Sequence, residues 1–444
     1  MPVAAVHGLA VTGRAVATAF RAHGWDVRVS DDRADASHRA FADSVGAVFV
    51  DVSAPGGTDA LLLGADVLVP APGVPPHSPV VAAALARSVP VRSEIDIAYD
   101  WEQVRERGPR PVLAVTGTDG KTTTTMLTAA LLRGSGLMVE EVGNTDVPFM
   151  AAVDDPSLDA FVVECSSFRL RFVDTFRAEA AVWLNFAPDH LDWHPDLDDY
   201  GWSKERVWAH ATGGDVAVAP SGSRRILEAA GRSAARVVTF GLEGADYRVE
   251  KGNLVSPHGV LCSTDSLWRS MPHDITNSLA AAALVIESGL VPAGSVGEAL
   301  RTFVPAHHRI EHVGRFDGVD WYDDSKATSP HAAATAIRAF EKVVLIAGGR
   351  NKGLDLRGLA CEPDRMVAVV AIGDDAAGVA DAFEGVCPVD IAGDMESAVR
   401  SARARASRGV TVLLSPGCTS YDWYSNYGER GDDFVAKVHK VHAS

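Results

Sequence analysis

The chain has 444 residues, of which 47% are hydrophobic, and a formal net charge of −17. This length leaves room for about three domains, and the hydrophobic content is ordinary for globular proteins. The excess of acidic residues argues against a nucleic-acid backbone or an anionic membrane surface as the main partner.

Short apolar runs that end in glycine alternate with alanine-rich stretches from the first residues onward. A strand, a glycine turn and a helix are expected within residues 3–24, and further strands within 25–32, 46–52 and 65–74. Strands that alternate with helices in this way predict an α/β domain with a mostly parallel sheet. The series ends near the charged, proline-containing segment 93–111.

Two more series of the same kind follow. The second begins with PVLAVTG at residue 111 and closes with the alanine-rich helix NSLAAAALVIESG. The third begins near VPAHHRIEHVGRF and contains three apolar runs that each end in a glycine turn, KVVLIAGG, MVAVVAIGDD and GVTVLLSPG. We therefore predict three α/β domains, at residues 1–93, 94–304 and 305–444.

The first glycine turn has the spacing of a dinucleotide-binding fingerprint. Gly8 and Gly13 hold the outer positions, Asp31 stands where a ribose-binding acid would follow, and Ala10 replaces the middle glycine. That middle glycine lets the backbone approach a pyrophosphate, so alanine weakens the prediction of NAD binding. A purely structural turn and a site for another nucleotide-like ligand both remain open.

The second series begins with AVTGTDGKTTTT at residues 114–125. A buried strand, a glycine turn and a helix start occur in the order that a phosphate loop needs. Lys121 can reach phosphate oxygens, and the Thr122 hydroxyl can bind magnesium. The alternative is a glycine-rich turn that carries a surface lysine, because the loop is shorter than the usual phosphate loop.

Polar side chains follow two other strands of this series. Glu164 lies near the end of one expected strand, ahead of Ser166, and Asp189 and His190 follow the end of another. Because parallel strands end at the same edge of a sheet, these groups are expected beside the phosphate loop. A carboxylate and an imidazole there suit a metal that also holds phosphate oxygens, although a lone histidine is more often a surface or capping residue.

Several further motifs accompany the loop: GNTDVP, ECSSFRL, NFAPDHLDWH, HDITNSLAA and HHR. Together with the short G-T-x-G-K-T loop they make the chain resemble the Mur ligase family, ATP-dependent enzymes that form amide bonds in peptidoglycan assembly. Within it, DDSKATSP and SPGCTSYDWYSNYGERG resemble the members that add D-glutamate to UDP-N-acetylmuramoyl-L-alanine. The resemblance implies a Rossmann-like UDP-binding domain, a central ATPase-like domain and a Rossmann-like amino-acid-binding domain.

The resemblance also implies a role for each matched position. ATP would contact Gly117, Thr118, Asp119, Gly120, Lys121, Thr122, Thr123, Asn277, Arg309 and Asp324. The UDP substrate would contact Thr12, Asp31, Arg33, Gly73, Asn144, Ser166 and His190. D-Glutamate would contact Lys326, Thr328, Lys352, Ser420 and Tyr427. The implied catalytic residues are Lys121, Glu164, His190, Lys204 and Lys326.

Two magnesium ions are implied, held by Thr122, Glu164, His190 and a carbamate on Lys204. The carbamate forms when carbon dioxide adds to a neutral lysine amine. From the residues alone, Lys204 lies in a charged helical stretch and is expected to be solvated. Five positions depart from the family pattern: Asp274, Tyr421, Tyr427, Arg350 and Asn351.

Other interpretations stay open at this point: a ligase that adds another amino acid, a folylpolyglutamate-like enzyme, a non-catalytic nucleotide-binding module, or a dinucleotide-dependent oxidoreductase. The N-terminus lacks a basic leader, and no apolar run approaches a membrane span. The five cysteines show neither metal-ligand spacing nor an even count. We therefore expect a cytoplasmic monomer with small-molecule substrates and no nucleic-acid partner.

Overall fold

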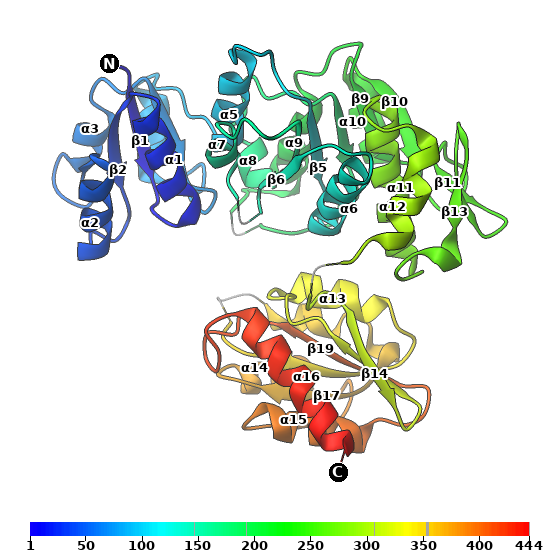
Figure 1. The fold of residues 1–444 in the computed structure, drawn as a ribbon. Helices are drawn as coiled ribbons and strands as arrows, with labels where there is room; N and C mark the ends of the chain where they lie inside the picture. The colour runs from blue at the N-terminus through cyan, green and yellow to red at the C-terminus, as the bar shows by residue number, and fades with distance from the viewer. Residues whose placement is uncertain (146, 192, 306, 352–354, 444) are drawn as a thin grey trace. The chain divides into compact units, whose positions relative to one another are not determined.

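The computed structural model describes residues 1–145, 147–191, 193–305, 307–351 and 355–443. The chain forms two compact units, Met1–Phe303 and Val304–Ser444, which are described separately. The strands of the described residues form three mostly parallel sheets and one small antiparallel sheet, so the predicted α/β class is confirmed. Figure 1 shows the elements in chain order.

The first sheet is parallel throughout, with strand order β3-β2-β1-β4. Its strands are β1 (Val3–His7), β2 (Asp26–Ser30), β3 (Val48–Phe49) and β4 (Val67–Pro70). Its helices are α1 (Val11–Ala22), α2 (Ala36–Val45), α3 (Gly57–Leu62) and α4 (Pro79–Ala86). The turn from β1 to α1 needs both of its glycines: Gly8 has a φ of 93°, and a Cβ on Gly13 would lie 1.8 Å from the Gly8 carbonyl oxygen.

The second sheet belongs to the same unit and is also parallel, with strand order β10-β9-β8-β5-β7-β6. Its strands are β5 (Val112–Thr116), β6 (Val139–Gly143), β7 (Ala160–Glu164), β8 (Ala180–Trp183), β9 (Val216–Pro220) and β10 (Arg236–Phe240). The helices of this region are α5 (Glu94–Gln103), α6 (Lys121–Gly134), α7 (Phe149–Ala152), α8 (Ser167–Leu170), α9 (Leu197–Glu205), α10 (Arg224–Arg232), α11 (Pro272–Glu287) and α12 (Ala293–Thr302).

Helices cover both faces of this second sheet. On one face, Leu113 and Val115 of β5 share an apolar core with residues of α6, α11 and α12. On the other face, Ala114 of β5 shares a core with α5, α7 and α10, and that core continues into β1, β2 and α1. The continuity of this second core is the physical reason why the first two sheets form one unit.

A small antiparallel sheet follows, in the order β11-β12-β13, with strands β11 (Arg248–Glu250), β12 (Asn253–Ser256) and β13 (Gly259–Ser263). The sequence patterns did not predict it. Its strands have three to five residues, and Leu254 and Cys262 are among the side chains that they bury against α11 and α12.

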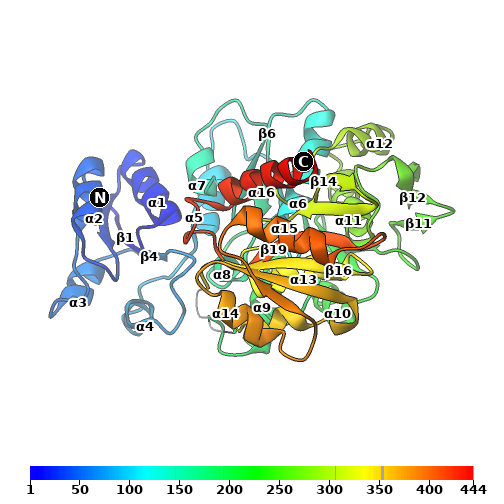
Figure 2. The same cartoon turned by 90° about the horizontal axis from the view of Figure 1, so that it is seen from below.

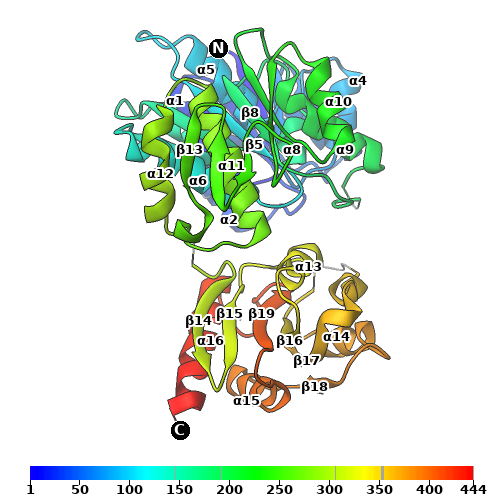
Figure 3. The ribbon, with the colours of Figure 1, turned by 90° about the vertical axis from the view of Figure 1, so that its right-hand side faces the viewer.

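The second unit contains a six-stranded sheet with strand order β14-β15-β19-β16-β17-β18. Figure 3 shows the six strands side by side in this order. The strands are β14 (Glu311–Phe316), β15 (Val319–Asp323), β16 (Val343–Gly348), β17 (Met366–Ile372), β18 (Val389–Ile391) and β19 (Thr411–Gly417), and only β14 runs antiparallel to its neighbour.

Helices again cover both faces. Figure 2 shows α15 (Met395–Arg405) and α16 (Tyr427–Ala443) on one face, where their apolar residues pack on β16, β17 and β19. The same view shows α13 (Pro330–Arg338) and α14 (Ala376–Ala382) on the opposite face. The apolar runs predicted as strands in this domain, KVVLIAGG, MVAVVAIGDD and GVTVLLSPG, form β16, β17 and β19.

Candidate functional site

The predicted phosphate loop joins the end of β5 to the start of α6. Gly120 stands at the N-cap of the helix with a φ of 78°, a backbone conformation that favours glycine. A Cβ at this position would lie 2.8 Å from Oδ1 of Asn277. The structure therefore brings Asn277, a predicted nucleotide contact on α11, directly against the loop.

The side chain of Lys121 bends back over the loop. Its Nζ donates hydrogen bonds to the carbonyl oxygens of Gly117 and Thr118, at 3.0 and 2.8 Å. These are neutral acceptors, and an anion in the loop would offer the ammonium group a stronger charge-assisted partner. The lysine is thus held at the loop by contacts that a phosphate can replace.

Asn185 holds the backbone of the loop, a role that no sequence pattern indicated. Its Oδ1 accepts hydrogen bonds from the backbone amides of Thr118 and Asp119, at 3.0 and 2.8 Å. Its Nδ2 donates to the carbonyl oxygen of Asp119 at 3.1 Å. The only available signal was the position of Asn185 in NFAPDH, two residues after the end of β8.

Lys204 lies beneath the same loop, and the expectation of a solvated lysine is wrong. Its side chain is only 1% exposed, and its Nζ donates to the Gly117 carbonyl oxygen at 2.6 Å. The Nζ also lies 4.6 Å from the ring centre of Tyr200 on the preceding turn of α9. Burial, together with the nearby charge of Lys121, lowers the pKa of Lys204 well below its ordinary value.

Glu164 is the last residue of β7 and is paired in register with Val115 of β5, two residues before the loop begins. Its side chain is buried. Oε1 accepts a hydrogen bond from Nδ2 of Asn144 at 2.8 Å, whereas Oε2 is buried and has no hydrogen-bond partner among the described residues. A buried carboxylate oxygen that accepts no hydrogen bond is well suited to bind a cation.

His190 lies in the loop that follows β8. Its backbone has a φ of 54°, its Nε2 lies 3.2 Å from Oδ2 of Asp189, and its ring centre lies 4.7 Å from that of Phe168 on α8. Since α8 begins three residues after Glu164, these contacts place His190 next to the segment that leaves β7. Ser166 caps that helix, and its Oγ accepts a hydrogen bond from the Arg169 amide.

A cavity of about 710 Å³ opens beside β1 and α1 in the first unit. Four predicted UDP-substrate residues line it: Thr12, Asp31, Gly73 and Asn144. The described lining does not include the other three, Arg33, Ser166 and His190. The Arg33 amide does contact the site indirectly, because it donates to Oδ1 of Asp31 at 3.0 Å.

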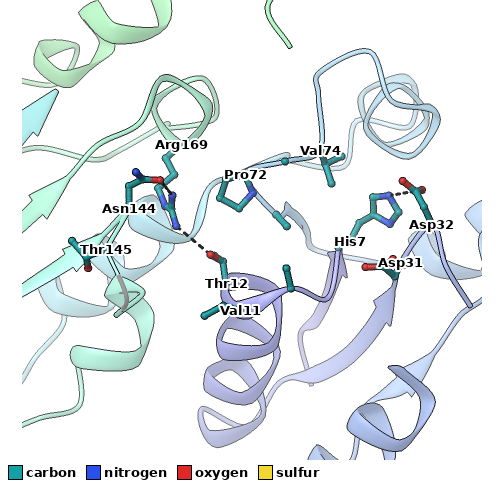
Figure 4. Close-up of a pocket in the computed structure, with 14 residues that line it drawn as sticks. His7, Val11, Thr12, Asp31, Asp32, Pro72, Val74, Asn144, Thr145 and Arg169 are labelled. Atoms are coloured by element: carbon teal, nitrogen blue, oxygen red, sulfur yellow. Dashed lines mark hydrogen bonds and ion pairs between the residues drawn. The ribbon is translucent and has the colours of Figure 1, made fainter. Parts of the chain in front are cut away.

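Three charged or titratable residues of this cavity were missed: His7, Asp32 and Arg169. Figure 4 shows His7 and Asp32 at one end of the cavity, with Arg169 at the other. The imidazole of His7 is buried, with Nε2 3.5 Å from Oδ1 of Asp32, and burial lowers the pKa of His7. The cavity thus has a mainly acidic end and a basic end, which suits a ligand whose anionic groups lie toward Arg169.

In the second unit, most predicted amino-acid contacts follow the carboxyl ends of neighbouring strands. Lys326 and Thr328 follow β15, whereas Ser420 and Tyr427 follow β19. The Nζ of Lys326 lies 5.3 Å from the ring centre of Tyr427, so two of these residues are in contact. Lys352 lies outside the described residues.

Two predicted nucleotide contacts also belong to this unit. Asp324 is buried, and its carboxylate accepts hydrogen bonds from Oγ of Ser415 at 2.7 Å and the Ile310 amide at 3.2 Å. Burial raises the pKa of Asp324 to about 7, although Ser415 and the charge of Arg309 act in the opposite direction. Arg309 is therefore an electrostatic neighbour of Asp324.

Three of the departures from the family pattern, Asp274, Arg350 and Tyr421, have distinct surroundings. Asp274 is fully buried and forms a bidentate ion pair with Arg269, with the Nη2–Oδ1 distance at 2.8 Å. Arg350 pairs with Asp374 at 3.0 Å, so its charge is already balanced within the unit. Tyr421 is 61% exposed.

Family models match the chain in three parts. The Mur ligase MurD-like N-terminal domain matches residues 3–93, the Mur ligase middle domain matches 115–285, and the Mur ligase glutamate ligase domain matches 308–418.

None of the described helices is both long enough and apolar enough to traverse a lipid bilayer.

Curated relatives match the chain over nearly its whole length. It is 38% identical to a UDP-N-acetylmuramoylalanine–D-glutamate ligase from Frankia casuarinae, over 99% of this chain and 94% of the relative. It is 37% identical to the enzyme of the same name from Thermobifida fusca, over 98% of this chain and 97% of the relative.

Solved structures agree with the fold. The UDP-N-acetylmuramate-alanine ligase MurC from Thermotoga maritima is 19% identical, with a TM-score of 0.58 over 99% of this chain and all of that one. A folylpolyglutamate synthase from Mycobacterium tuberculosis is 18% identical, with a TM-score of 0.60 over 77% of this chain and 94% of that one. At these identities the likeness concerns the fold alone.

Proposed function

The chain belongs to the Mur ligase family, and from this premise we propose that it joins D-glutamate to UDP-N-acetylmuramoyl-L-alanine at the expense of ATP. The relatives that match nearly the whole chain carry the name of this activity. The observation that supports it most directly is the cluster of Lys121, Lys204 and Glu164 at the ends of β5 and β7, in the same unit as a nucleotide-sized cavity.

The proposed reaction activates a carboxylate. An oxygen of the alanyl carboxylate attacks the γ-phosphorus of ATP, the bond to ADP breaks, and an acyl phosphate forms. The amine of D-glutamate then attacks the acyl carbon and loses a proton, and the tetrahedral intermediate collapses when the bond to the phosphate oxygen breaks. Phosphoryl transfer of this kind depends mainly on positioning and on charge stabilisation.

Lys121 supplies positive charge for the transferring phosphoryl group in this proposal. Its ammonium group exchanges the carbonyl oxygens of Gly117 and Thr118 for phosphate oxygens when ATP binds. Asn185 keeps the loop in shape during this exchange, because its side-chain oxygen still accepts hydrogen bonds from the Thr118 and Asp119 amides. Asn277, beside Gly120, contacts the nucleotide in this proposal, and Arg309 and Asp324 are assigned to the nucleotide by the family resemblance alone.

The residues present fit the magnesium ions that the family implies. The buried Oε2 of Glu164 has no partner among the described residues, and a divalent cation would satisfy it. Bound magnesium would neutralise charge on the phosphate oxygens. Thr122, Glu164, His190 and carbamylated Lys204 are the proposed holders of two ions.

The lowered pKa of the Lys204 amine supports the proposed carbamate. Carbon dioxide reacts with the neutral form, and the lowered pKa of Lys204 increases the fraction of that form near neutral pH. The neutral amine loses a proton as it adds carbon dioxide, so carbamylation replaces an uncharged group near Lys121 with an anion of opposite charge.

The remaining substrate groups are assigned by the same proposal. The UDP part binds in the cavity beside α1, with contacts from Thr12, Asp31, Arg33, Gly73 and Asn144, and with Ser166 and His190 near the acyl end. D-Glutamate binds Lys326, Thr328, Lys352, Ser420 and Tyr427, where lysines meet its carboxylates. The enzyme acts as a cytoplasmic monomer in this account.

An oxygen-labelling experiment tests the acyl phosphate. Substrate carrying ¹⁸O in the alanyl carboxylate is incubated with ATP, magnesium and D-glutamate, and the released phosphate is analysed by mass spectrometry. The proposed route transfers one carboxylate oxygen to each phosphate. Unlabelled phosphate formed together with the amide product would contradict it.

A further inference from the structure

A continuous hydrogen-bonded network joins the cavity of the first unit to Glu164. Arg169 donates from Nη2 to Oγ1 of Thr12 at 3.2 Å and from Nη1 to Oδ1 of Asn144 at 2.8 Å. Asn144 in turn donates from Nδ2 to Oε1 of Glu164 at 2.8 Å. Figure 4 shows Arg169 between Thr12 and Asn144, with both contacts drawn.

The position of Arg169 is fixed by a buried countercharge. Its Nε lies 3.1 Å from Oε1 of Glu94 on α5, and the two side chains are only 4% and 2% exposed. Oε2 of Glu94 also accepts a hydrogen bond from the Met150 amide at 3.2 Å. Since the guanidinium group is planar and always charged, a single orientation of Arg169 serves Glu94, Thr12 and Asn144 together.

This orientation determines how Asn144 meets Glu164. A guanidinium group only donates hydrogen bonds, so the Asn144 oxygen must face Arg169 and its NH₂ group must face Glu164. The Glu164 carboxylate only accepts and so favours the same orientation, and without Arg169 the amide loses the donor contact that holds its oxygen in place. The donor contact from Asn144 keeps Oε1 of Glu164 occupied and leaves Oε2 as the oxygen without a described partner.

We propose that Arg169 is a positioning residue that couples occupancy of the cavity beside α1 to the orientation of the Glu164 carboxylate. An anionic ligand in the cavity attracts Arg169, which lines it, and tightens the contact with Asn144. Asn144 then holds Glu164 in the geometry that accepts a divalent cation. This inference rests on the proposed function, because it takes Glu164 as a magnesium ligand.

A merely structural role makes a different prediction. In that case Arg169 would only balance Glu94 and fasten α8 to α5, and its replacement would lower stability without changing cation binding. The chain offers a matched control in Arg110, which forms a buried ion pair with Glu102 on the same helix α5. Their side chains are 4% and 1% exposed, and neither residue lines the cavity.

The test measures ADP affinity by isothermal titration calorimetry, with magnesium or with EDTA, and with or without UDP-N-acetylmuramoyl-L-alanine. ADP permits no turnover, so the readout is binding alone. The gain is the factor by which magnesium raises ADP affinity over that in EDTA. In the wild type, this gain should be at least about fivefold larger with substrate in the cavity than without it. In Arg169→Gln the gains with and without substrate should agree within about twofold, while ADP affinity in EDTA stays unchanged.

Two further variants keep the test decisive if Arg169→Gln folds poorly. Arg169→Lys retains the charge beside Glu94 but lacks the planar fork, and it should also lose the coupling. Asn144→Asp replaces the NH₂ donor with an oxygen and should lose both the coupling and part of the magnesium effect. Arg110→Gln should retain the full coupling.

Folded Arg169 and Asn144 variants with wild-type coupling would overturn the inference while leaving the proposed function intact. A wild type whose ADP affinity does not respond to magnesium at all would overturn the metal role of Glu164, and the inference with it. The two failures are therefore distinguishable.

Discussion

Lys121 and Lys204 donate hydrogen bonds to the same acceptor, the carbonyl oxygen of Gly117, at 3.0 and 2.6 Å. One amine belongs to the partly exposed phosphate loop and the other is fully buried beneath it. Two positive charges this close repel each other. The buried amine of Lys204 therefore loses its proton more easily, because burial and the charge of Lys121 both lower its pKa. The loop therefore holds one charged lysine for phosphate and one amine that is readily neutral.

The lowered pKa of Lys204 predicts a pH dependence of stability. Between the folded and unfolded pKa values the unfolded chain holds one proton more, so the free energy of unfolding rises with pH by up to about 1.4 kcal/mol per pH unit. We expect the unfolding temperature of the wild type, relative to that of Lys204→Met, to rise between pH 7 and pH 9.5. Calorimetry in bicarbonate-free buffer measures this, and a difference that stays flat with pH would contradict it.

Replacement of Lys121 by alanine should weaken ATP binding and leave UDP binding unchanged. ATP affinity should fall at least about thirtyfold, or about 2 kcal/mol, because a charged partner of the phosphates is lost. UDP affinity should stay within twofold of the wild type, since Lys121 does not line the cavity beside α1. Titration calorimetry of Lys121→Ala and of the exposed control Lys251→Ala checks both values. Equal ATP affinity in the two variants would exclude the phosphate-loop assignment.

Asn185 should contribute to the stability of the loop. Asn185→Ala removes the side-chain acceptor of the Thr118 and Asp119 amides. We expect a loss of about 1–3 kcal/mol in the free energy of unfolding and weaker ATP binding. Denaturant titration with Asn253→Ala as a control measures this, because the Asn253 side chain donates one hydrogen bond to the Lys251 carbonyl oxygen within the described part of the chain. A loss no larger than that of the control would count against the assigned role.

The buried ion pair of Arg269 and Asp274 predicts that a second substitution restores the stability lost in the first. Arg269→Met leaves the fully buried Asp274 without its bidentate partner and should cost about 3–5 kcal/mol of stability. Adding Asp274→Asn removes the uncompensated charge, so the double variant should recover most of that loss. Thermal or denaturant unfolding of the single and double variants provides the comparison. A double variant as unstable as Arg269→Met would show that the ion pair is not the cause.

Strand ends and glycine turns made much of the fold predictable. The expected strand ending at Glu164 is β7, and the expected loop at Gly117 joins β5 to α6. Parallel strands place Glu164 beside the loop because β5 and β7 are neighbours in the sheet. The position of Asn277 beside the loop was expected from the resemblance to the Mur ligase family, because no local sequence pattern indicates it.

Other features depend on contacts that a local pattern does not contain. The buried residues of α9 are Tyr200, Gly201, Ser203 and Lys204, which form no apolar stripe, so the burial of Lys204 had no signal in the sequence. Arg169 and Glu94 lie 75 residues apart, and only tertiary packing brings them together. The small antiparallel sheet was missed because its strands are too short for a clear alternation.

The amino-acid specificity of the protein tests the proposed ligase activity most directly. The protein is incubated with ATP, magnesium and UDP-N-acetylmuramoyl-L-alanine, and phosphate release is measured with D-glutamate, L-glutamate, L-alanine, L-lysine and meso-diaminopimelate in turn. We expect phosphate release with D-glutamate well above that with any of the other amino acids. Release at background level with D-glutamate, or faster release with another amino acid, would contradict it.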